Sequence, residues 1–213
     1  MPPGSYQFEE DVAAPLVEVG FNMLIPEGWT SFDLTGDTLA QRRAELNDSF
    51  DGSPEARAAM NDLLVQTRQF VTDAARSGLI SASGVCEEYE DGLFLASVAV
   101  FAFHPPQGED ADPLRMVDHI HPKEQQRSEN LWLRTLTVEI PSAGVCGRVQ
   151  GIAEHDLTED ASVQMVVMHT AVNVPGSRVK LLVSCSSPNL PEVDGLLDLF
   201  DAITATLRFW EDV

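Results

Sequence analysis

Residues 163–174, VQMVVMHTAVNV, decide the fold of this chain. Apolar side chains occupy both alternating sets of positions along the stretch. Val163, Met165 and Val167 form one set, and Val166, Met168 and Val172 form the other. Successive side chains of a β-strand point to opposite faces of the sheet. The stretch therefore predicts a strand at the centre of a sheet that is covered by other elements on both faces.

Further strands are expected on either side of this stretch. Residues 79–89 and 93–103 flank Glu90-Asp91-Gly92, and an Asp-Gly pair between two apolar runs is typical of a β-hairpin. Strands are also expected at residues 131–140, 146–154 and 178–184. Near the start of the chain, residues 19–25 and the alternating segment 32–34 are expected to pair as an N-terminal hairpin around the turn PEGW.

Three helices are predicted from apolar residues at helical spacing, two before the β-rich region and one after it. They cover about residues 37–50, 53–77 and 189–207. Ser53 and Pro54 suit the start of the second helix, Gly78 suits its end, and Asn189 is the expected N-cap of the last. This order of elements predicts an α+β protein, a three-layer α/β/α sandwich with a mainly antiparallel sheet.

The composition is that of a globular protein, with 44% hydrophobic and 22% charged residues among 213. A chain of this length can bury a sizeable core. We expect residues 1–18 to form a flexible N-terminal lead-in. Residues 19–213 are then expected to form a single domain, with a loop insert at about residues 104–130.

The chain is strongly acidic, with 34 Asp and Glu against 13 Lys and Arg and a formal net charge of -21. Nucleic acids and anionic membranes are bound by Lys and Arg, so the charge argues against both and favours either a well-solvated surface or a basic protein partner. Residues 1–14 lack the basic start of a secretory signal, and no apolar run approaches the ~18 residues of a membrane span. The three cysteines form no close pair. A cytoplasmic location is the resulting expectation.

Several stretches resemble a known family. FNMLIPEGWTSFDL at residues 21–34 resembles the opening strand and turn of the Mog1/PsbP-like proteins, and residues 174–209 resemble their closing hairpin and last helix. LTVEIPSAGVCGRV at residues 136–149 is similar to a stretch in small actinobacterial proteins of this kind, the LpqN-like proteins. The resemblance implies an α/β/α sandwich and non-enzymatic work, such as binding a protein partner or assisting assembly or secretion. We expect this chain to differ from the LpqN-like lipoproteins in lacking a signal peptide and a lipid-acceptor cysteine.

Signatures of the common catalytic and cofactor sites are missing from the sequence, which contains no phosphate-binding loop, dinucleotide fingerprint, nucleophile elbow or C-x-x-C motif. His119 and His121 have the spacing of two metal ligands, but no second cluster completes a site, and a solvated loop is the expectation there. Cys86, Cys146 and Cys185 lie in or beside predicted strands and are expected to be buried. We therefore assign no catalytic, cofactor-binding or metal-binding residue.

The expected function is non-catalytic protein binding of an accessory or chaperone-like kind, with a secretion or toxin system as a candidate setting. Trp132, Arg42 and Arg43 are the candidate partner-binding residues, because exposed Trp and Arg side chains often anchor interfaces. A buried Trp and arginines paired with neighbouring acids are the alternatives for these residues. The alternative function is a small hydrolase or thiol enzyme with a cleft near Cys146 or near the insert at 104–130.

Overall fold

The computed structural model describes residues 19–34, 73–90, 92–105, 114–115, 117, 131–158 and 161–211. The expected lead-in, most of the first two predicted helices, Arg42, Arg43 and the pair His119 and His121 lie outside the described residues. Residues 73–76 are helical, as expected for the end of the second helix. Gly78 follows them with a φ of 92°, a backbone conformation that glycine adopts readily at a helix end.

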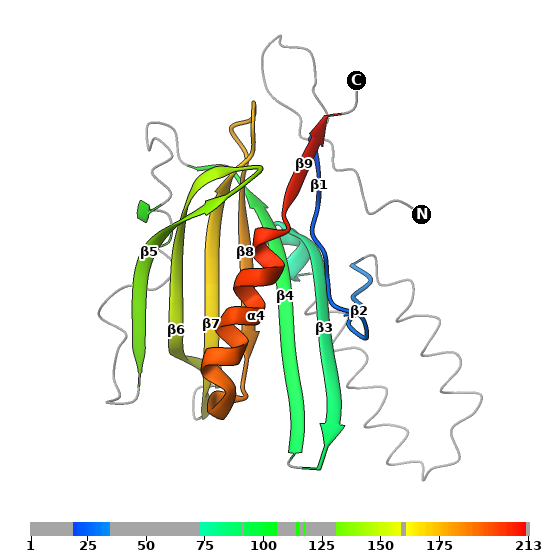
Figure 1. Ribbon diagram of the computed structural model, residues 1–213, viewed down its shortest axis with the longest axis vertical. Coiled ribbons are helices and arrows are strands. Elements are labelled where there is room, and N and C mark those ends of the chain that lie inside the picture. Colours follow the sequence, from blue (N-terminus) through cyan, green and yellow to red (C-terminus); the bar gives the residue numbers. More distant parts are fainter. Residues whose placement is uncertain are drawn as a thin grey trace, which may run out of the picture.

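Most of the described residues belong to one sheet of seven strands in the order β2-β3-β4-β8-β7-β6-β5 (Figure 1). The strands are β2 (Thr30–Ser31), β3 (Leu79–Tyr89), β4 (Gly92–Phe103), β5 (Trp132–Ile140), β6 (Gly144–Thr158), β7 (Ala161–Asn173) and β8 (Lys180–Ser187). Every pair of neighbours in this sheet runs antiparallel, which confirms the predicted sheet type. A separate two-stranded sheet is formed by β1 (Val19–Asn22) and β9 (Arg208–Glu211).

Helix α4 (Val193–Ala205), which follows the short 3-10 helix η2 (Leu190–Glu192), covers one face of the large sheet (Figure 1). The apolar stripe predicted for it is buried at Leu196, Leu197, Phe200 and Ile203. Phe200 has no exposed surface and belongs to the same core as Met168 on β7 and Cys185 on β8. The protein is therefore an α+β protein with a mainly antiparallel sheet.

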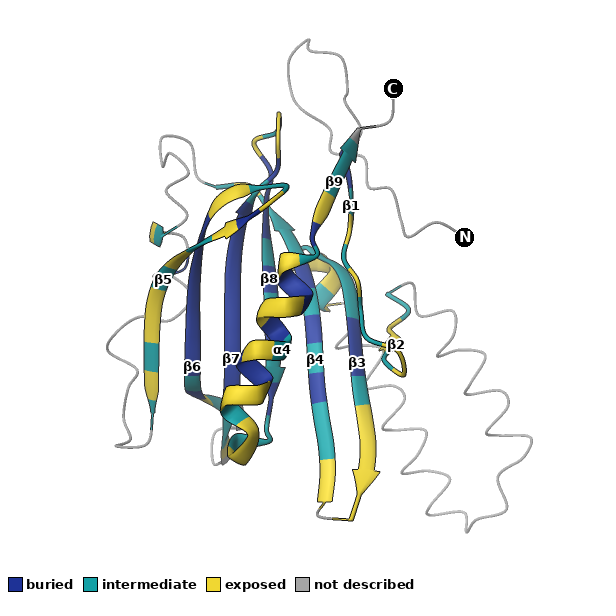
Figure 2. Ribbon diagram, in the orientation of Figure 1, coloured by how far each residue is buried: buried dark blue, intermediate teal, exposed yellow. Residues whose placement is uncertain are grey.

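The second face of the sheet is also covered at its centre. Val166, Val167 and Met168 in β7 are each at most 1% exposed, although adjacent strand residues point to opposite faces. Val149 and Ala171 form a smaller core on the second face with Val117, which belongs to the 104–130 insert. β6 and β7, which lie between the central strand β8 and the edge strand β5, are accordingly buried over long stretches in Figure 2. This confirms the prediction from residues 163–174, while the helices expected to form the third layer lie outside the described residues.

One prediction near the ends of the chain is wrong, and another is right in position only. The expected N-terminal hairpin does not form, because β1 pairs with β9 and β2 pairs with β3. The ring of Trp210 occupies the space above Gly20, where an added Cβ would lie 2.3 Å from a ring carbon, so this glycine is what admits the β9 side chain. Asn189 is the N-cap residue of η2, which leads into α4, but its side chain makes no capping bond there. Instead its side-chain oxygen accepts a hydrogen bond from the Leu95 N–H at 2.8 Å and ties the loop after β8 to β4.

Candidate functional site

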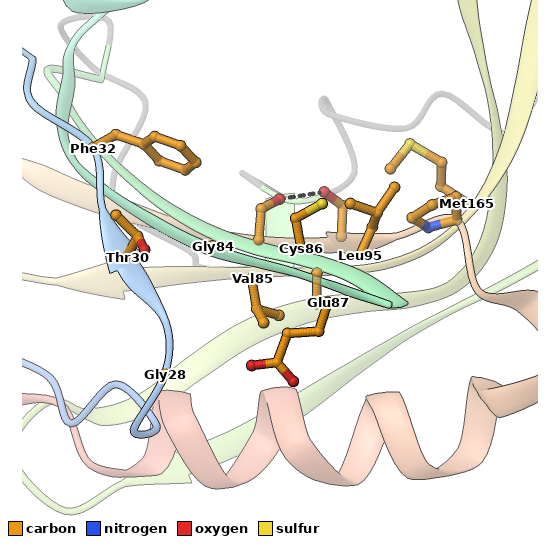
Figure 3. Close-up of a pocket in the computed structure, with 13 residues that line it drawn as sticks. Gly28, Thr30, Phe32, Gly84, Val85, Cys86, Glu87, Leu95 and Met165 are labelled. Atoms are coloured by element: carbon orange, nitrogen blue, oxygen red, sulfur yellow. Dashed lines mark hydrogen bonds between the residues drawn. The ribbon is translucent and has the colours of Figure 1, made fainter. Parts of the chain in front are cut away.

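An open hollow of about 600 Å³ lies near the β2 edge of the sheet, mainly on the face opposite α4 (Figure 3). We call it the edge groove. Its principal lining residues are Phe32, Gly84, Cys86, Leu95, Ser97 and Ser186. Gly28 and Thr30, which lie beyond the outer edge of β3, line it as well. The edge groove therefore reaches from the sheet face to the outer edge of β3.

The floor of the edge groove is a row of small residues on three neighbouring strands. Gly84 on β3 lies opposite Ser97 on β4, and Ser97 lies opposite Ser186 on β8. The two serine hydroxyls are 2.9 Å apart and form a hydrogen bond with each other (Figure 3). Because small side chains fill little space above the sheet, the row leaves a hollow, and the serine pair satisfies much of its own polarity.

The walls of the edge groove are apolar. Phe32 follows β2 and is 52% exposed, and Leu95 and Met165 stand on the far side of the hollow (Figure 3). The Phe32 N–H donates to the Ala82 carbonyl at 2.9 Å, which holds its backbone against β3. A Cβ added at Gly84 would lie 3.2 Å from the Phe32 ring, so the glycine lets the ring lie directly over the sheet.

Cys86 is the exposed thiol of the edge groove, whereas Cys146 and Cys185 are buried. Burial raises the pKa of the Cys146 thiol, although the charge of Arg148 opposes this. Burial raises the pKa of Cys185 to about 12, against smaller opposing effects of a hydrogen bond with Thr204 and of Arg148. The expectation of three buried cysteines is thus wrong for Cys86. It lies where β3 extends past β2, so that β4 is its described neighbouring strand on one side alone.

Glu87 is the carboxylate among the described lining residues, and its side chain points toward α4, on the other side of β3 from Cys86 (Figure 3). The Tyr89 hydroxyl donates to Glu87 Oε2 at 2.5 Å. This hydrogen bond, together with the negative charge of Glu87, raises the pKa of Tyr89. The described part of the edge groove therefore offers apolar contact area and hydroxyl groups. The carboxylate of Glu87 points away from the thiol of Cys86.

Of the residues predicted for partner binding, Trp132 is described, and it lies away from the edge groove. Trp132 lies on β5, at the opposite edge of the sheet, and is 38% exposed. The Arg134 guanidinium lies 5.9 Å from the centre of its ring, in cation–π geometry. Arg42 and Arg43 lie outside the described residues. The role of all three in binding stays a prediction.

Cys146, the centre of the alternative enzyme hypothesis, faces α4 together with Arg148, as its spacing predicts. Its thiol donates to the Gly144 carbonyl at 3.6 Å. Arg148 is 3% exposed and pairs with Asp201 on α4. The described residues contain no group of three or more His, Cys, Asp and Glu side chains placed to hold a metal ion.

The sequence offered little signal for the edge groove. Phe32 alternates with polar neighbours and Leu95 lies in an apolar run, both of which are common in strands, and Gly84, Ser97 and Ser186 come from three separate strands. Their alignment depends on the register of β3, β4 and β8, which periodicity does not give. The Gly residue within a predicted strand was the one available pointer to a close approach, here that of Phe32.

No protein-family model and no curated protein matches this chain. Its structure is similar to that of LpqN, a protein involved in cell envelope biogenesis of Mycobacterium tuberculosis, with a TM-score of 0.47 and 10% sequence identity. The similarity covers 92% of this chain and 86% of that chain. It accompanies the LpqN-like resemblance of the sequence, and the Mog1/PsbP assignment stays a prediction. No helix within the described ranges is long and apolar enough to cross a membrane.

Proposed function

We propose that this protein is a non-catalytic binding protein, accessory or chaperone-like, that holds an apolar part of a protein partner in the edge groove. The observation that supports this proposal is the apolar wall that Phe32, Leu95 and Met165 raise around a floor of small residues. An open apolar hollow on a soluble surface is typical of an interaction site. The strongly acidic composition favours a partner with basic residues.

The thiol-enzyme alternative has less support from the same residues. A nucleophilic cysteine needs a nearby cation or base that stabilises its thiolate. Cys146 is buried and its pKa is raised, so it is held in the unreactive thiol form. Cys86 is exposed, but the lining carboxylate beside it in sequence points to the other face of β3. Apolar binding uses the groove as it stands, whereas thiol chemistry requires groups that these residues do not supply.

Partner capture with two matched variants tests the proposal. Phe32→Ala removes an exposed wall of the edge groove, and Leu24→Ala removes an equally apolar side chain that is 67% exposed outside it. We expect a protein from extracts of the native cell to be retained by the unmodified chain and by Leu24→Ala, and to be released by Phe32→Ala. We also expect the retained protein to slow alkylation of Cys86. A partner that binds Phe32→Ala as well as the unmodified chain, and leaves Cys86 reactive, contradicts the proposal.

A further inference from the structure

We propose that the edge groove receives an extended segment of the partner, in which apolar residues alternate with basic ones, and that this segment adds a strand to the outer edge of β3 at Cys86–Glu88. This inference rests on the proposed function and specifies the part of the partner that is bound. It follows from the hydrogen-bonding direction of β3, the position of the edge groove and the charge of the β3–β4 hairpin.

The outer edge of β3 has backbone groups directed away from the sheet. The Ala82 carbonyl points outward, because it accepts the Phe32 N–H at 2.9 Å. Along a strand the N–H and C=O of every second residue point to the same side, so those of Gly84, Cys86 and Glu88 also point outward.

The hydrogen bonds of Leu95 on β4 also show that the backbone groups of Cys86 point outward. Cys86 lies opposite Leu95 in the β3–β4 ladder. The Leu95 N–H donates to Asn189 on the side away from β3, and its carbonyl accepts from Ser187 on that side. Residues directly opposite each other in an antiparallel pair either bond to each other or both point away, and Leu95 and Cys86 are therefore a pair that points away.

Strand β2 covers only a short part of this edge. It pairs with Ser83 and Gly84, while β3 continues to Tyr89 (Figure 1). The turn before β2 passes this edge on its α4 side, where a Cβ added at Gly28 would lie 3.4 Å from Glu87 Oε1 (Figure 3). No described strand lies beside the outward groups of Cys86 and Glu88. A row of outward N–H and C=O groups at a sheet edge is a template for an added strand, and peptide recognition by strand addition uses it.

The edge groove lies where the side chains of such a strand would be placed. Thr30 and Phe32 on the β2 segment line the groove, and they show how alternate side chains beyond β3 reach it. A strand added beside Cys86–Glu88, beyond the turn at Gly28, would lie about 4.8 Å from β3 and direct every second side chain to the same face. Those side chains would meet the Phe32 ring and the floor, which suits apolar residues.

The hairpin that carries this edge is acidic. Glu87, Glu88 and Glu90 lie at its tip, and residues 79–103 contain no Lys or Arg. Glu87 and Glu88 are adjacent in the strand and therefore point to opposite faces. The end of β3 is exposed in Figure 2. Complementary charge thus favours Lys or Arg in the bound segment, at positions that flank the apolar ones.

The same charges disfavour a second copy of this chain as the occupant. Because β2 already covers Ser83 and Gly84, two copies that pair through this edge of both chains could use only residues 85–89 of each β3. That pairing brings Glu87 and Glu88 of both copies together, and like charges across a strand pair are destabilising. A basic partner segment relieves the repulsion that a second copy adds.

Synthetic peptides test the backbone part of the proposal without altering the protein. The parent probe is a ten-residue peptide that alternates Val and Lys, and its acidic control alternates Val and Glu. Two further probes carry backbone N-methyl groups on alternate residues of the parent, on the odd positions in one and on the even positions in the other. Binding is measured by fluorescence anisotropy and by the rate at which N-ethylmaleimide alkylates Cys86.

We expect the parent peptide to bind, to slow alkylation of Cys86 and to bind more tightly than the acidic control. One N-methyl set should weaken binding about tenfold or more, because it removes the N–H groups that face β3, and the other should change it by about threefold or less. Equal effects of the two sets would overturn strand addition. Equal binding of the Val-Lys and Val-Glu peptides would overturn the basic character of the segment.

A pair of variants separates backbone from charge on the protein side. Glu88→Gln removes the charge and keeps the outward N–H, whereas Glu88→Pro removes both and leaves the ladder to β4 intact, since proline is tolerated at an edge position. We expect Glu88→Pro to bind the parent peptide about tenfold more weakly than Glu88→Gln does. Similar affinities of the two variants, with both folded by circular dichroism, would overturn the proposal.

The outcomes also separate this inference from the proposed function. A natural partner that depends on Phe32 but not on the outward N–H of Glu88 would overturn strand addition and leave the proposed function standing. A chain that sediments as a dimer, and dissociates in the Glu88→Pro variant, would overturn the partner segment in favour of a second copy. Failure of partner capture with the unmodified chain concerns the proposed function alone, because the peptide probes do not depend on it.

Discussion

Arg148 on β6 forms an ion pair with Asp201 on α4, and its Nε donates to the Thr170 hydroxyl on β7 at 3.0 Å. The Arg148 side chain is 3% exposed, whereas that of Asp201 is 58% exposed. The pair therefore joins the helix to the sheet by a buried cation whose partner is in contact with water. This asymmetry makes the two halves of the pair unequal in their effect on stability.

We expect Asp201→Ala to destabilise the fold by roughly 2–3 kcal/mol, because it leaves a buried cation without its carboxylate. The effect is smaller than for a fully buried pair, since water reaches the Asp201 side of the contact. Asp198→Ala, at another exposed position of α4, is the matched control and should stay within about 0.5 kcal/mol. Urea unfolding measures both variants. Equal midpoints for the two would show that the ion pair does not hold the helix to the sheet.

The raised pKa of Cys185 predicts a loss of stability at alkaline pH. The folded thiol has a pKa of about 12 against an ordinary value of 9.0, so folding favours its protonated form. This stabilisation is fully present below pH 9 and is lost as the pH rises toward 12. Its full size corresponds to roughly 4 kcal/mol.

Unfolding of Cys185→Ala isolates this contribution. The variant should show a shallower fall in the free energy of unfolding between pH 9 and pH 11 than the unmodified chain, because it has no thiol to ionise. Cys86→Ala is the matched control, because it makes the same substitution at an exposed position. If all three proteins lose stability in parallel, another group governs the alkaline transition.

The three thiols should differ in their rate of alkylation. Cys86 is exposed and is expected to react within minutes at neutral pH, whereas Cys146 and Cys185 are buried, have raised pKa values and must wait for local unfolding. Mass spectrometry of the native protein should therefore show one rapid modification at Cys86. The unfolded protein without reductant should show three, as expected for free thiols. Rapid native modification of Cys146 would revive the thiol-enzyme alternative.

The sequence predicted the sheet well because its determinants are local. The apolar alternation of residues 163–174 identified a strand covered on both faces, and Asp91-Gly92 identified the β3–β4 hairpin. Pairing between distant segments was harder to predict. The residue pattern of β1 does not identify β9 as the strand with which it pairs, nor does the pattern of β9 identify β1. Their contact depends on Gly20 making room for Trp210, which becomes visible only in three dimensions.

The candidate site was harder to predict than the fold for a physical reason. The edge groove is lined by residue types that are common in any strand, such as Ser97 and Ser186. Its proposed function depends on the hollow above these small side chains and not on reactive groups. Phe32 and Trp132 could each pack in the core or contact a partner, depending on their exposure. Neither hydrophobicity nor spacing in the sequence distinguishes these two roles. The charge on the hairpin was readable from the sequence, but its position beside an open sheet edge was not.

The kinetics of partner binding should respond separately to charge and to apolar contact. The net charge of -21 attracts a basic segment over a distance that salt limits to about 8 Å at physiological ionic strength. We therefore expect the association rate of the Val-Lys peptide to fall as salt rises, with little change in its dissociation rate.

Two variants separate the contribution of charge from that of apolar contact. Glu88→Gln combined with Glu90→Gln should lower the association rate and its salt dependence. Phe32→Ala should instead speed dissociation, because it removes apolar contact from the bound state. Stopped-flow measurements at low and high salt distinguish these effects. An association rate that does not change with salt, or a Phe32→Ala variant that dissociates as slowly as the unmodified chain, would contradict this division between the acidic hairpin and the apolar groove.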